Sequence, residues 1–259
     1  MSQELSQAIS RRPFVLSGGG ARGYAHLGVL KAFEEHRIFP QVIAATSAGS
    51  IAAAFICDGF GIEEIKEIFL KKKLTLSVHF RKWRNGFFSL ETVEKVLKET
   101  LRSTNFESLK LPLFVAATNF NTGSQVIFNK GPLVPAILAA SSIPMVFPPV
   151  MIEQVPYVDG GLSNNLPVEA LIAHYRNIIG VHVNPLTTYN PAGGFLENVE
   201  RTLHLAIREQ VLKSKLLCSR FIEPDGLSKY GMFDFKNFDA IYNTALDYTR
   251  KLLQEEAEA

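Results

Sequence analysis

The feature that most constrains this chain is a short apolar segment that runs directly into three glycines and then into a helix. Residues 13–17 are a strand candidate, residues 18–23 read GGGARG, and residues 24–37 have the spacing of an amphipathic helix. A second unit follows, with a buried strand at 42–46 and an alanine-rich helix at 47–57 that begins at a serine. Repeated strand-turn-helix units predict a parallel sheet with its functional groups at the carboxyl ends of the strands.

The rest of the chain extends this α/β pattern. The further candidates are helices at 62–70, 89–101, about 199–218 and the last 20 or so residues, and strands at 113–119, 123–129 and 178–183. The two strands around the Asn-Thr-Gly turn form a hairpin, which we place at a sheet edge. We therefore predict a three-layer α/β/α fold with a mostly parallel central sheet.

Composition limits the class of protein. The chain has 259 residues, 47% of them hydrophobic and 20% charged, so residues 1–259 are expected to form one domain with a substantial core. A net charge of +2 gives no reason to expect nucleic acid as a partner. The two cysteines, Cys57 and Cys218, suit neither a disulfide framework nor a zinc site, and we expect a reducing, cytoplasmic location. Neither a metal nor a cofactor is expected.

Two segments imitate targeting signals. Arg11 and Arg12 resemble a twin-arginine signal, but glycines follow where an apolar region should stand, so no signal peptide is predicted. The uncharged stretch 131–152 is long enough to span a bilayer, but its five prolines exclude a spanning helix.

The glycine loop, residues 18–23, satisfies G-x-G-x-x-G between a strand and a helix. Glycines let the backbone approach a ligand, and free N–H groups at a helix start attract negative charge. The same donors can hold a nucleotide phosphate or the oxyanion of a tetrahedral intermediate, and a tight turn without a ligand is the third interpretation.

Ser47 is the candidate nucleophile. The segment Ala45-Thr46-Ser47-Ala48-Gly49 follows a strand and opens a helix, as in the nucleophile elbow G-x-S-x-G, with Ala45 in place of the first glycine. Small residues on either side are needed because the serine occupies a strained turn. The alternative is that Ser47 only caps the helix.

The candidate base is a carboxylate. None of the six histidines has a distinctive catalytic context, and His182, inside the strand at 178–183, is most simply a buried structural residue. Asp159 precedes Gly160 and Gly161, whose turn could aim the carboxylate into a cleft. By itself, Asp-Gly signals only a turn.

Glycine loop, serine elbow and Asp-Gly-Gly occur in the order found in one family. The chain resembles the patatin-like phospholipases, and specifically compact bacterial members similar to the catalytic domain of neuropathy target esterase. The resemblance covers about residues 14–185 and includes ASSIP at 140–144, Phe147-Pro148 and Asn165-Leu166-Pro167. The helical part from about 190 to 259 carries no recognised motif.

The resemblance implies a Ser-Asp dyad, with Ser47 as nucleophile and Asp159 as proton acceptor. It also implies an oxyanion hole in the glycine loop, formed by Gly18, Gly19, Gly20, Ala21, Arg22 and Gly23. Gly19, Gly20 and Ala21 are expected to supply N–H donors, and Arg22 a nearby positive charge. The implied reaction is hydrolysis of fatty acyl esters of phospholipids or lysophospholipids through an acyl-serine.

Two further sets of residues are candidates for lipid contact. Ile143, Met145, Val146 and Phe147 are expected to line an acyl pocket, although core packing explains them almost as well. Basic and aromatic side chains alternate in 71–90, where Lys71, Lys72, Lys73 and Trp83 form a hypothetical lid or peripheral membrane contact. Ordinary solvated and core positions are the alternative.

Three competing functions are left. A nucleotide-binding protein should have an acidic residue at the end of the second strand, where this chain has Ala45-Thr46-Ser47. A non-catalytic lipid-binding or regulatory module would retain the fold without the reaction. An acyltransferase or thioesterase would share the acyl-enzyme and differ only in the acceptor.

Overall fold

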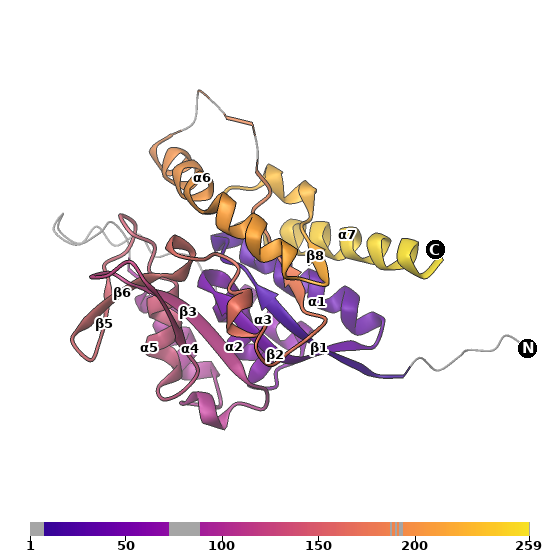
Figure 1. The fold of residues 1–259 in the computed structure, drawn as a ribbon, viewed down its shortest axis with the longest axis horizontal. Helices are drawn as coiled ribbons and strands as arrows, with labels where there is room; N and C mark the ends of the chain where they lie inside the picture. The colour runs from indigo at the N-terminus through magenta and orange to yellow at the C-terminus, as the bar shows by residue number, and fades with distance from the viewer. Residues whose placement is uncertain (1–7, 73–88, 187, 190, 192–193, 259) are drawn as a thin grey trace, which may run out of the picture.

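The computed structural model describes residues 8–72, 89–186, 188–189, 191 and 194–258. Its centre is one eight-stranded sheet with the order β5-β6-β3-β2-β1-β7-β8, and β4 pairs with β3 outside this path (Figure 1). The strands are β1 (Ser10–Leu16), β2 (Ile38–Thr46), β3 (Leu113–Asn119), β4 (Gln125–Phe128), β5 (Val150–Ile152), β6 (Val155–Asp159), β7 (Ile179–Val181) and β8 (Arg220–Ile222).

The helices follow the sequence periodicity closely. They are α1 (Tyr24–Glu35), α2 (Ser47–Cys57), α3 (Ile62–Lys71), α4 (Glu91–Thr100), α5 (Leu133–Ala140), α6 (Phe195–Leu216) and α7 (Phe238–Glu258). Among them α5 was not predicted, because its segment contains Pro135. That proline stands in the first turn of α5, where the N–H it lacks would have no partner in the helix.

The mostly parallel sheet is confirmed, and the predicted hairpin supplies one of its edge strands. Strands β8, β7, β1, β2 and β3 run parallel, whereas β4, β5 and β6 are antiparallel to their neighbours. The predicted hairpin is β3–β4: β3 pairs with β2 and then with β6 along one side and with β4 along the other, and among the described strands β4 pairs with β3 alone, so it lies at an edge of the sheet. A second hairpin, β5–β6, was not predicted, because its strands of three and five residues are too short and proline-interrupted to show a period of two.

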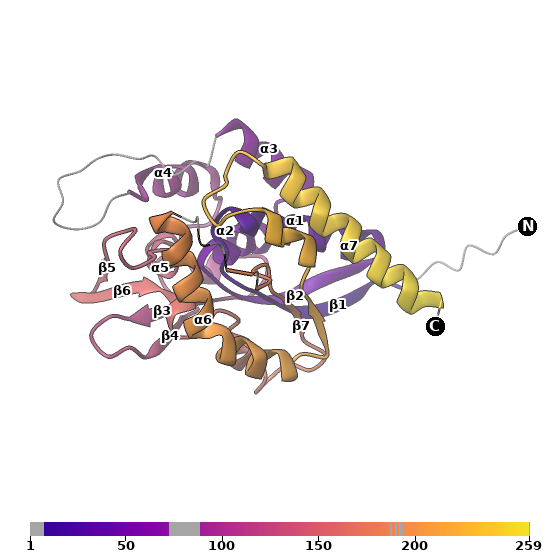
Figure 2. The ribbon, with the colours of Figure 1, turned by 90° about the horizontal axis from the view of Figure 1, so that it is seen from above.

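Different elements pack against the two faces of the sheet. Successive residues of β1 point to opposite faces: Phe14 and Leu16 belong to the large core under α1, α2 and α5, whereas Val15 faces the other side. Leu166 and Leu171, from the irregular segment between β6 and β7, cover that second side. The C-terminal α7 packs along α1, and α6 crosses the molecule at its surface (Figure 2).

The segment 131–152 is placed as predicted, outside any bilayer span, since it contains α5 and part of the β5–β6 hairpin. Within the described residues, none of the helices combines the length and the apolar character needed to span a membrane.

Candidate active site

Ser47 stands at a strained turn between β2 and α2. Its backbone φ is +50°, in the left-handed region that a non-glycine residue adopts only at some energetic cost. The turn is tight because α2 begins against the end of β1: a Cβ on Gly49 would lie 2.5 Å from the Ser17 carbonyl oxygen. The cap position of α2 is held by Thr46, whose side chain makes no capping bond, and Ser47 is the first residue of the helix, so Ser47 is not the helix cap.

The glycine loop lies directly against this turn. A Cβ on Gly18 would come within 2.8 Å of the Ser47 Cβ, and a Cβ on Gly23 within 2.6 Å of the Ala48 Cβ. Real side chains do not approach so closely, so glycine is required at both positions. The contact brings the loop's backbone to the serine side chain.

Two N–H groups of the loop are free for a ligand. In the described part of the chain the N–H groups of Gly19 and Gly20 have no hydrogen-bond partner. The N–H of Ala21 donates to the Met232 carbonyl at 2.7 Å, and that of Arg22 donates to the Gly19 carbonyl at 3.1 Å. The expectation that Ala21 supplies a donor is therefore wrong for this structure, because the returning C-terminal segment already occupies it.

The side chain of Arg22 is also engaged elsewhere. Its guanidinium lies 2.8 Å from Glu200 and donates to the Tyr230 carbonyl at 2.7 Å. Burial lowers the pKa of Arg22, and the charge and hydrogen bond of Glu200 oppose this shift. Because its charge is matched by Glu200, Arg22 fixes the glycine loop to α6 and does not serve as a free cation beside Ser47.

Asp159 is a buried carboxylate at the end of β6. Its Oδ1 accepts the Gly161 N–H at 2.7 Å, and in the described residues its buried Oδ2 has no hydrogen-bond partner. Burial raises the pKa of Asp159 from its ordinary 3.8 to about 6; the nearby Ser47 hydroxyl and the Gly161 N–H oppose the rise. The contact between the Asp159 carboxylate and the Ser47 hydroxyl does not meet the geometry of a hydrogen bond. Ser47 and Asp159 line the same small cavity as Gly18 and Gly19.

Two asparagines hold the loop in position. Asn165 Oδ1 accepts the Gly18 N–H at 3.1 Å, and Asn184 Nδ2 donates to the Gly18 carbonyl at 2.6 Å. Asn165 was noted only as part of a motif, and Asn184 was missed. An asparagine after a strand is a weak signal, because its partner is known only once the fold is known.

Histidine is present near the pocket but is not arranged as a conventional base. His182 bonds to Glu223 at 2.7 Å and lies against Phe221, away from the cavity of Ser47. Among the described residues, His204 of α6 lines that cavity, and its Nε2 has no hydrogen-bond partner. Burial and the positive charge of Arg22 lower the pKa of His204 to about 3, so its ring is neutral near pH 7.

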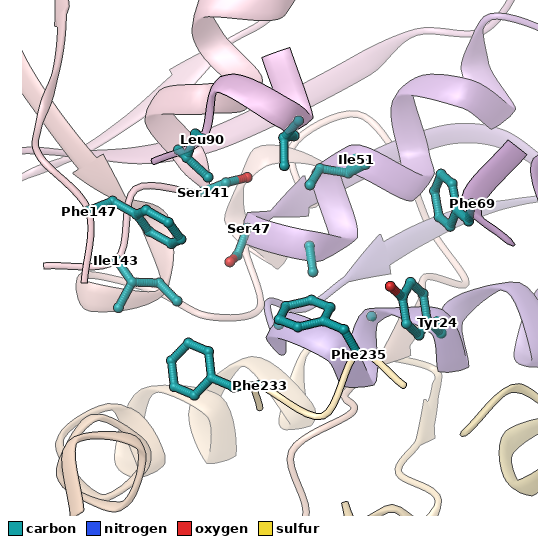
Figure 3. Close-up of a pocket in the computed structure, with 14 residues that line it drawn as sticks. Tyr24, Ser47, Ile51, Phe69, Leu90, Ser141, Ile143, Phe147, Phe233 and Phe235 are labelled. Carbon is teal, nitrogen blue, oxygen red and sulfur yellow. The ribbon is translucent and has the colours of Figure 1, made fainter. Parts of the chain in front are cut away.

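A second, apolar pocket also borders Ser47. Figure 3 shows the Ser47 hydroxyl directed into a space enclosed by aromatic and aliphatic side chains from distant parts of the chain. Its wall includes Tyr24, Ile51, Phe69, Leu90, Ile143, Phe147, Phe233 and Phe235. Phe233 and Phe235 were missed, because the segment that carries them has neither a motif nor a regular period.

Of the four residues predicted to line an acyl pocket, only two do so in the structure. Ile143 and Phe147 line the apolar pocket. Val146 is buried behind them in a small cluster with Met232. Met145 is 57% exposed, at a backbone φ of +67°, and is not part of the pocket wall, which corrects the prediction for this residue.

The predicted lid lies largely outside the described residues. Lys73 and Trp83 are not described. Lys71 and Lys72 are, and they form ion pairs with Glu67 at 2.7 Å and Glu99 at 3.1 Å. The described residues contain no group of three or more His, Cys, Asp or Glu side chains able to hold a metal ion.

Comparison with known proteins places this geometry in a family. The sequence model described as patatin-like phospholipase matches residues 14–172. An uncharacterised NTE family protein of Mycobacterium tuberculosis is 27% identical over 94% of this chain and 46% of its own length. The lysophospholipase NTE1 of Saccharomyces cerevisiae is 25% identical over 93% of this chain and 16% of its own length.

The fold is also found among solved structures. The crystal structure of VipD from Legionella pneumophila superposes with a TM-score of 0.57 at 14% identity, covering 98% of this chain and 69% of VipD. This likeness concerns the fold alone. The chain spans about half or less of the length of the curated relatives named above.

Proposed function

The chain belongs to the patatin-like phospholipase family, and from this premise we propose that it is a lipid acyl hydrolase in which Ser47 is the nucleophile and Asp159 its base. The observation that carries the proposal is the common cavity. The strained Ser47, the buried carboxylate of Asp159 and Gly19, whose N–H group is free, all border it, and Gly20, with the second free N–H group, lines the adjoining apolar pocket at Ser47. A nucleophile, a base and anion donors are the three parts that acyl transfer requires.

In the first step, the Ser47 oxygen attacks the ester carbonyl carbon while Asp159 accepts the hydroxyl proton. A pKa of about 6 makes Asp159 a better base than an ordinary aspartate and still leaves most of it ionised at pH 7. The tetrahedral oxyanion lies on the N–H groups of Gly19 and Gly20. Each such donor is worth roughly 3 to 4 kcal/mol in other hydrolases.

The intermediate then collapses. The bond from the carbonyl carbon to the leaving oxygen breaks, Asp159 returns its proton to that oxygen, and an alcohol or lysolipid departs from the acyl-serine. Water, deprotonated by Asp159, attacks the acyl carbon; the bond from that carbon to Ser47 Oγ breaks, Asp159 returns the proton to Oγ, and the fatty acid departs. No metal or cofactor takes part in this sequence.

The apolar pocket supports a fatty acyl substrate. It begins at Ser47, and its aromatic wall of Tyr24, Phe147 and Phe235 offers no charged partner for a headgroup. The polar part of the substrate would therefore lie toward Asn184 and His204, in the small cavity that Ser47 shares with Asp159. A phospholipid or lysophospholipid satisfies both sides. The apolar wall beside the glycine loop also disfavours a nucleotide as the ligand.

The experiment is hydrolysis of lysophosphatidylcholine and phosphatidylcholine by the purified chain, with released fatty acid measured in water enriched in oxygen-18. Wild type should release labelled fatty acid, and Ser47→Ala should lose at least about a thousandfold in rate. Ser214→Ala is the matched control, because Ser214 is also a buried serine, lies in α6 and has a hydroxyl without a hydrogen-bond partner in the described residues. Fatty acid released by Ser47→Ala at the wild-type rate would refute the proposal.

The same experiment separates the related functions. An acyltransferase would transfer the acyl group to an added alcohol in preference to labelled water. A non-catalytic lipid-binding module would bind lysophospholipid without turnover. We propose a cytoplasmic enzyme with peripheral membrane contact, and the free thiols of Cys57 and Cys218 support the reducing location.

A further inference from the structure

One small cavity contains two buried polar atoms that lack a hydrogen-bond partner. The cavity is the one that Ser47 shares with Asp159, and we call it the Ser47 cavity. Among its buried side-chain atoms, Asp159 Oδ2 and His204 Nε2 have no partner in the part of the chain that the structure describes. A buried polar atom without a partner is costly, and few occur in a native fold. The Ser-Asp dyad accounts for Asp159 and gives His204 no role.

The packing of α6 brings His204 to the carboxylate of Asp159. The helix contacts the segment Gly160–Leu162, which follows Asp159 directly. Three residues of α6 border the Ser47 cavity, namely Leu203, His204 and Ile207. Two of them are aliphatic, so the imidazole of His204 is the polar group that α6 contributes to this wall.

The surroundings of His204 make its Nε2 a hydrogen-bond acceptor. Nδ1 lies 4.0 Å from Glu200 Oε1, and this carboxylate favours the ring proton on Nδ1. Burial and the positive charge of Arg22 lower the pKa of His204 to about 3, so the ring is neutral at pH 7. A neutral ring with its proton on Nδ1 has a lone pair at Nε2. The carboxylate of Asp159 is an acceptor as well, so only a donor can satisfy both atoms.

The Ser47 cavity has room for water. It leaves about 40 Å³ for the centres of water molecules, and one ordered water needs roughly 10 to 15 Å³. Two further cavities, of about 290 and 130 Å³, also border His204, and charged side chains line both of them. Water can therefore reach His204 from the polar side of the protein while an acyl chain fills the apolar pocket.

We propose that His204 holds the water that hydrolyses the acyl-serine. In the acyl-enzyme, Ser47 Oγ carries the acyl group and has no hydrogen to donate. One water donates a hydrogen bond to Asp159 Oδ2 and another to His204 Nε2, which leaves an oxygen lone pair for the acyl carbon. Asp159 takes the first proton as the new carbon–oxygen bond forms, whereas His204 takes no proton and orients the second O–H. This role rests on the proposed function, because it requires an acyl-serine.

The role of His204 is confined to one half of the reaction. Acylation requires the Ser47 hydroxyl, the Asp159 carboxylate and the oxyanion donors, and it uses no water. Loss of the acceptor at His204 should therefore slow the release of fatty acid and leave the formation of the acyl-serine unchanged. A residue that only supported the fold would affect both steps alike.

The test is a rapid-quench measurement with the enzyme in excess over p-nitrophenyl butyrate. Absorbance of the released p-nitrophenolate follows acylation, and mass spectrometry of the quenched protein follows the decay of the acyl adduct. His204→Leu and His204→Phe both remove the acceptor, and each should slow the decay about tenfold or more, with acylation within about threefold of wild type. His204→Gln keeps an acceptor oxygen and should restore most of the decay rate.

The control is the same substitution at another histidine. His174 is exposed and does not border the Ser47 cavity, so His174→Leu should leave both rates at their wild-type values. Far-ultraviolet circular dichroism and the rate of fluorophosphonate labelling check that each variant is folded and that its Ser47 is reactive. The use of both His204→Leu and His204→Phe keeps the test decisive if one of them fails to fold.

The outcomes separate this role from the proposed function. An acyl adduct that decays at the wild-type rate in folded His204→Leu or His204→Phe would overturn the role of His204, and so would an equal loss in acylation and decay. Either result would leave Ser47 as the nucleophile. Absence of an adduct on wild-type Ser47, with ester hydrolysis unchanged in Ser47→Ala, would instead refute the proposed function and the water site with it.

Discussion

The guanidinium of Arg22 lies 2.8 Å from the carboxylate of Glu200, and this ion pair joins the glycine loop to α6. Both side chains are largely buried, so neither charge can be removed alone without leaving its partner uncompensated. The other oxygen of Glu200 accepts the Met232 N–H at 2.9 Å, and the Met232 carbonyl accepts the Ala21 N–H. The pair therefore connects the loop, α6 and the segment after β8 in one network.

Breaking this pair should lower the stability of the fold. Glu200→Gln keeps an acceptor for Met232 but leaves Arg22 unpaired, and we expect it to lower the free energy of unfolding by about 3 kcal/mol. Replacing both, as Arg22→Met/Glu200→Gln, should recover part of that loss. Urea unfolding of Arg22→Met, Glu200→Gln and the double variant measures the coupling energy between the two side chains. Strictly additive losses would show that the pair is not coupled.

Because Gly23 lies so close to Ala48, a substitution at Gly23 should lower activity, and a second substitution at Ala48 should restore it. In Gly23→Ala the new Cβ would meet the Ala48 Cβ at 2.6 Å and push the loop away from Ser47. We expect a loss of about a hundredfold in kcat/KM, because the oxyanion donors would be displaced. Ala48→Gly in the same chain removes the clash and should restore most of the activity. Absence of rescue would mean that the loop position is set by other contacts.

The raised pKa of Asp159 predicts how stability depends on pH. The folded carboxyl binds its proton more tightly than the unfolded one, so stability falls as pH rises from about 4 to about 6, and the penalty is complete above that range. Asp159→Asn has no such penalty and should be more stable than wild type at pH 8, by on the order of 2 to 3 kcal/mol. Urea unfolding at pH 4 and pH 8 should show the difference shrinking at the lower pH.

The carboxyl group of Asp159 should also determine the pH below which kcat/KM falls. If Asp159 is the base, kcat/KM for a soluble ester falls below a pKa of about 6, and Asp159→Asn is nearly inactive at every pH. His204 makes the opposite prediction, since its pKa of about 3 would place the limb far lower. A strongly impaired His204→Gln beside an active Asp159→Asn would transfer the role of base to the histidine.

Narrowing the apolar pocket should change the preferred chain length. Ile51 of α2 lines the pocket, and Ile51→Trp should lower kcat/KM for long-chain p-nitrophenyl esters about tenfold while sparing the acetate. Ile56→Trp is the control on the same helix, because Ile56 does not line this pocket. Equal effects of Ile51→Trp on short and long esters would place the acyl chain elsewhere.

Local pattern was sufficient to predict part of this site. Ser47 and the glycine loop each follow a predicted strand, so sequence alone could assign them to one edge of a parallel sheet. Asp159 ends β6, which was not predicted and runs antiparallel to β3, so only the family resemblance selected it. Nothing local indicates that the N–H of Ala21 is occupied by Met232 or that Glu200 neutralises Arg22, because these partners come from the C-terminal part of the chain. The apolar wall had the same difficulty, since Phe233 and Phe235 belong to an irregular segment that only the tertiary fold brings to Ser47.

The most direct test of the central claim is labelling by a fluorophosphonate, followed by mass spectrometry of the intact protein and its peptides. We expect one adduct, on the peptide that contains Ser47, which is lost in Ser47→Ala, strongly slowed in Asp159→Asn and unchanged in Ser214→Ala. An adduct that persists in Ser47→Ala, or that maps to another serine, would contradict the assignment of Ser47 as the nucleophile.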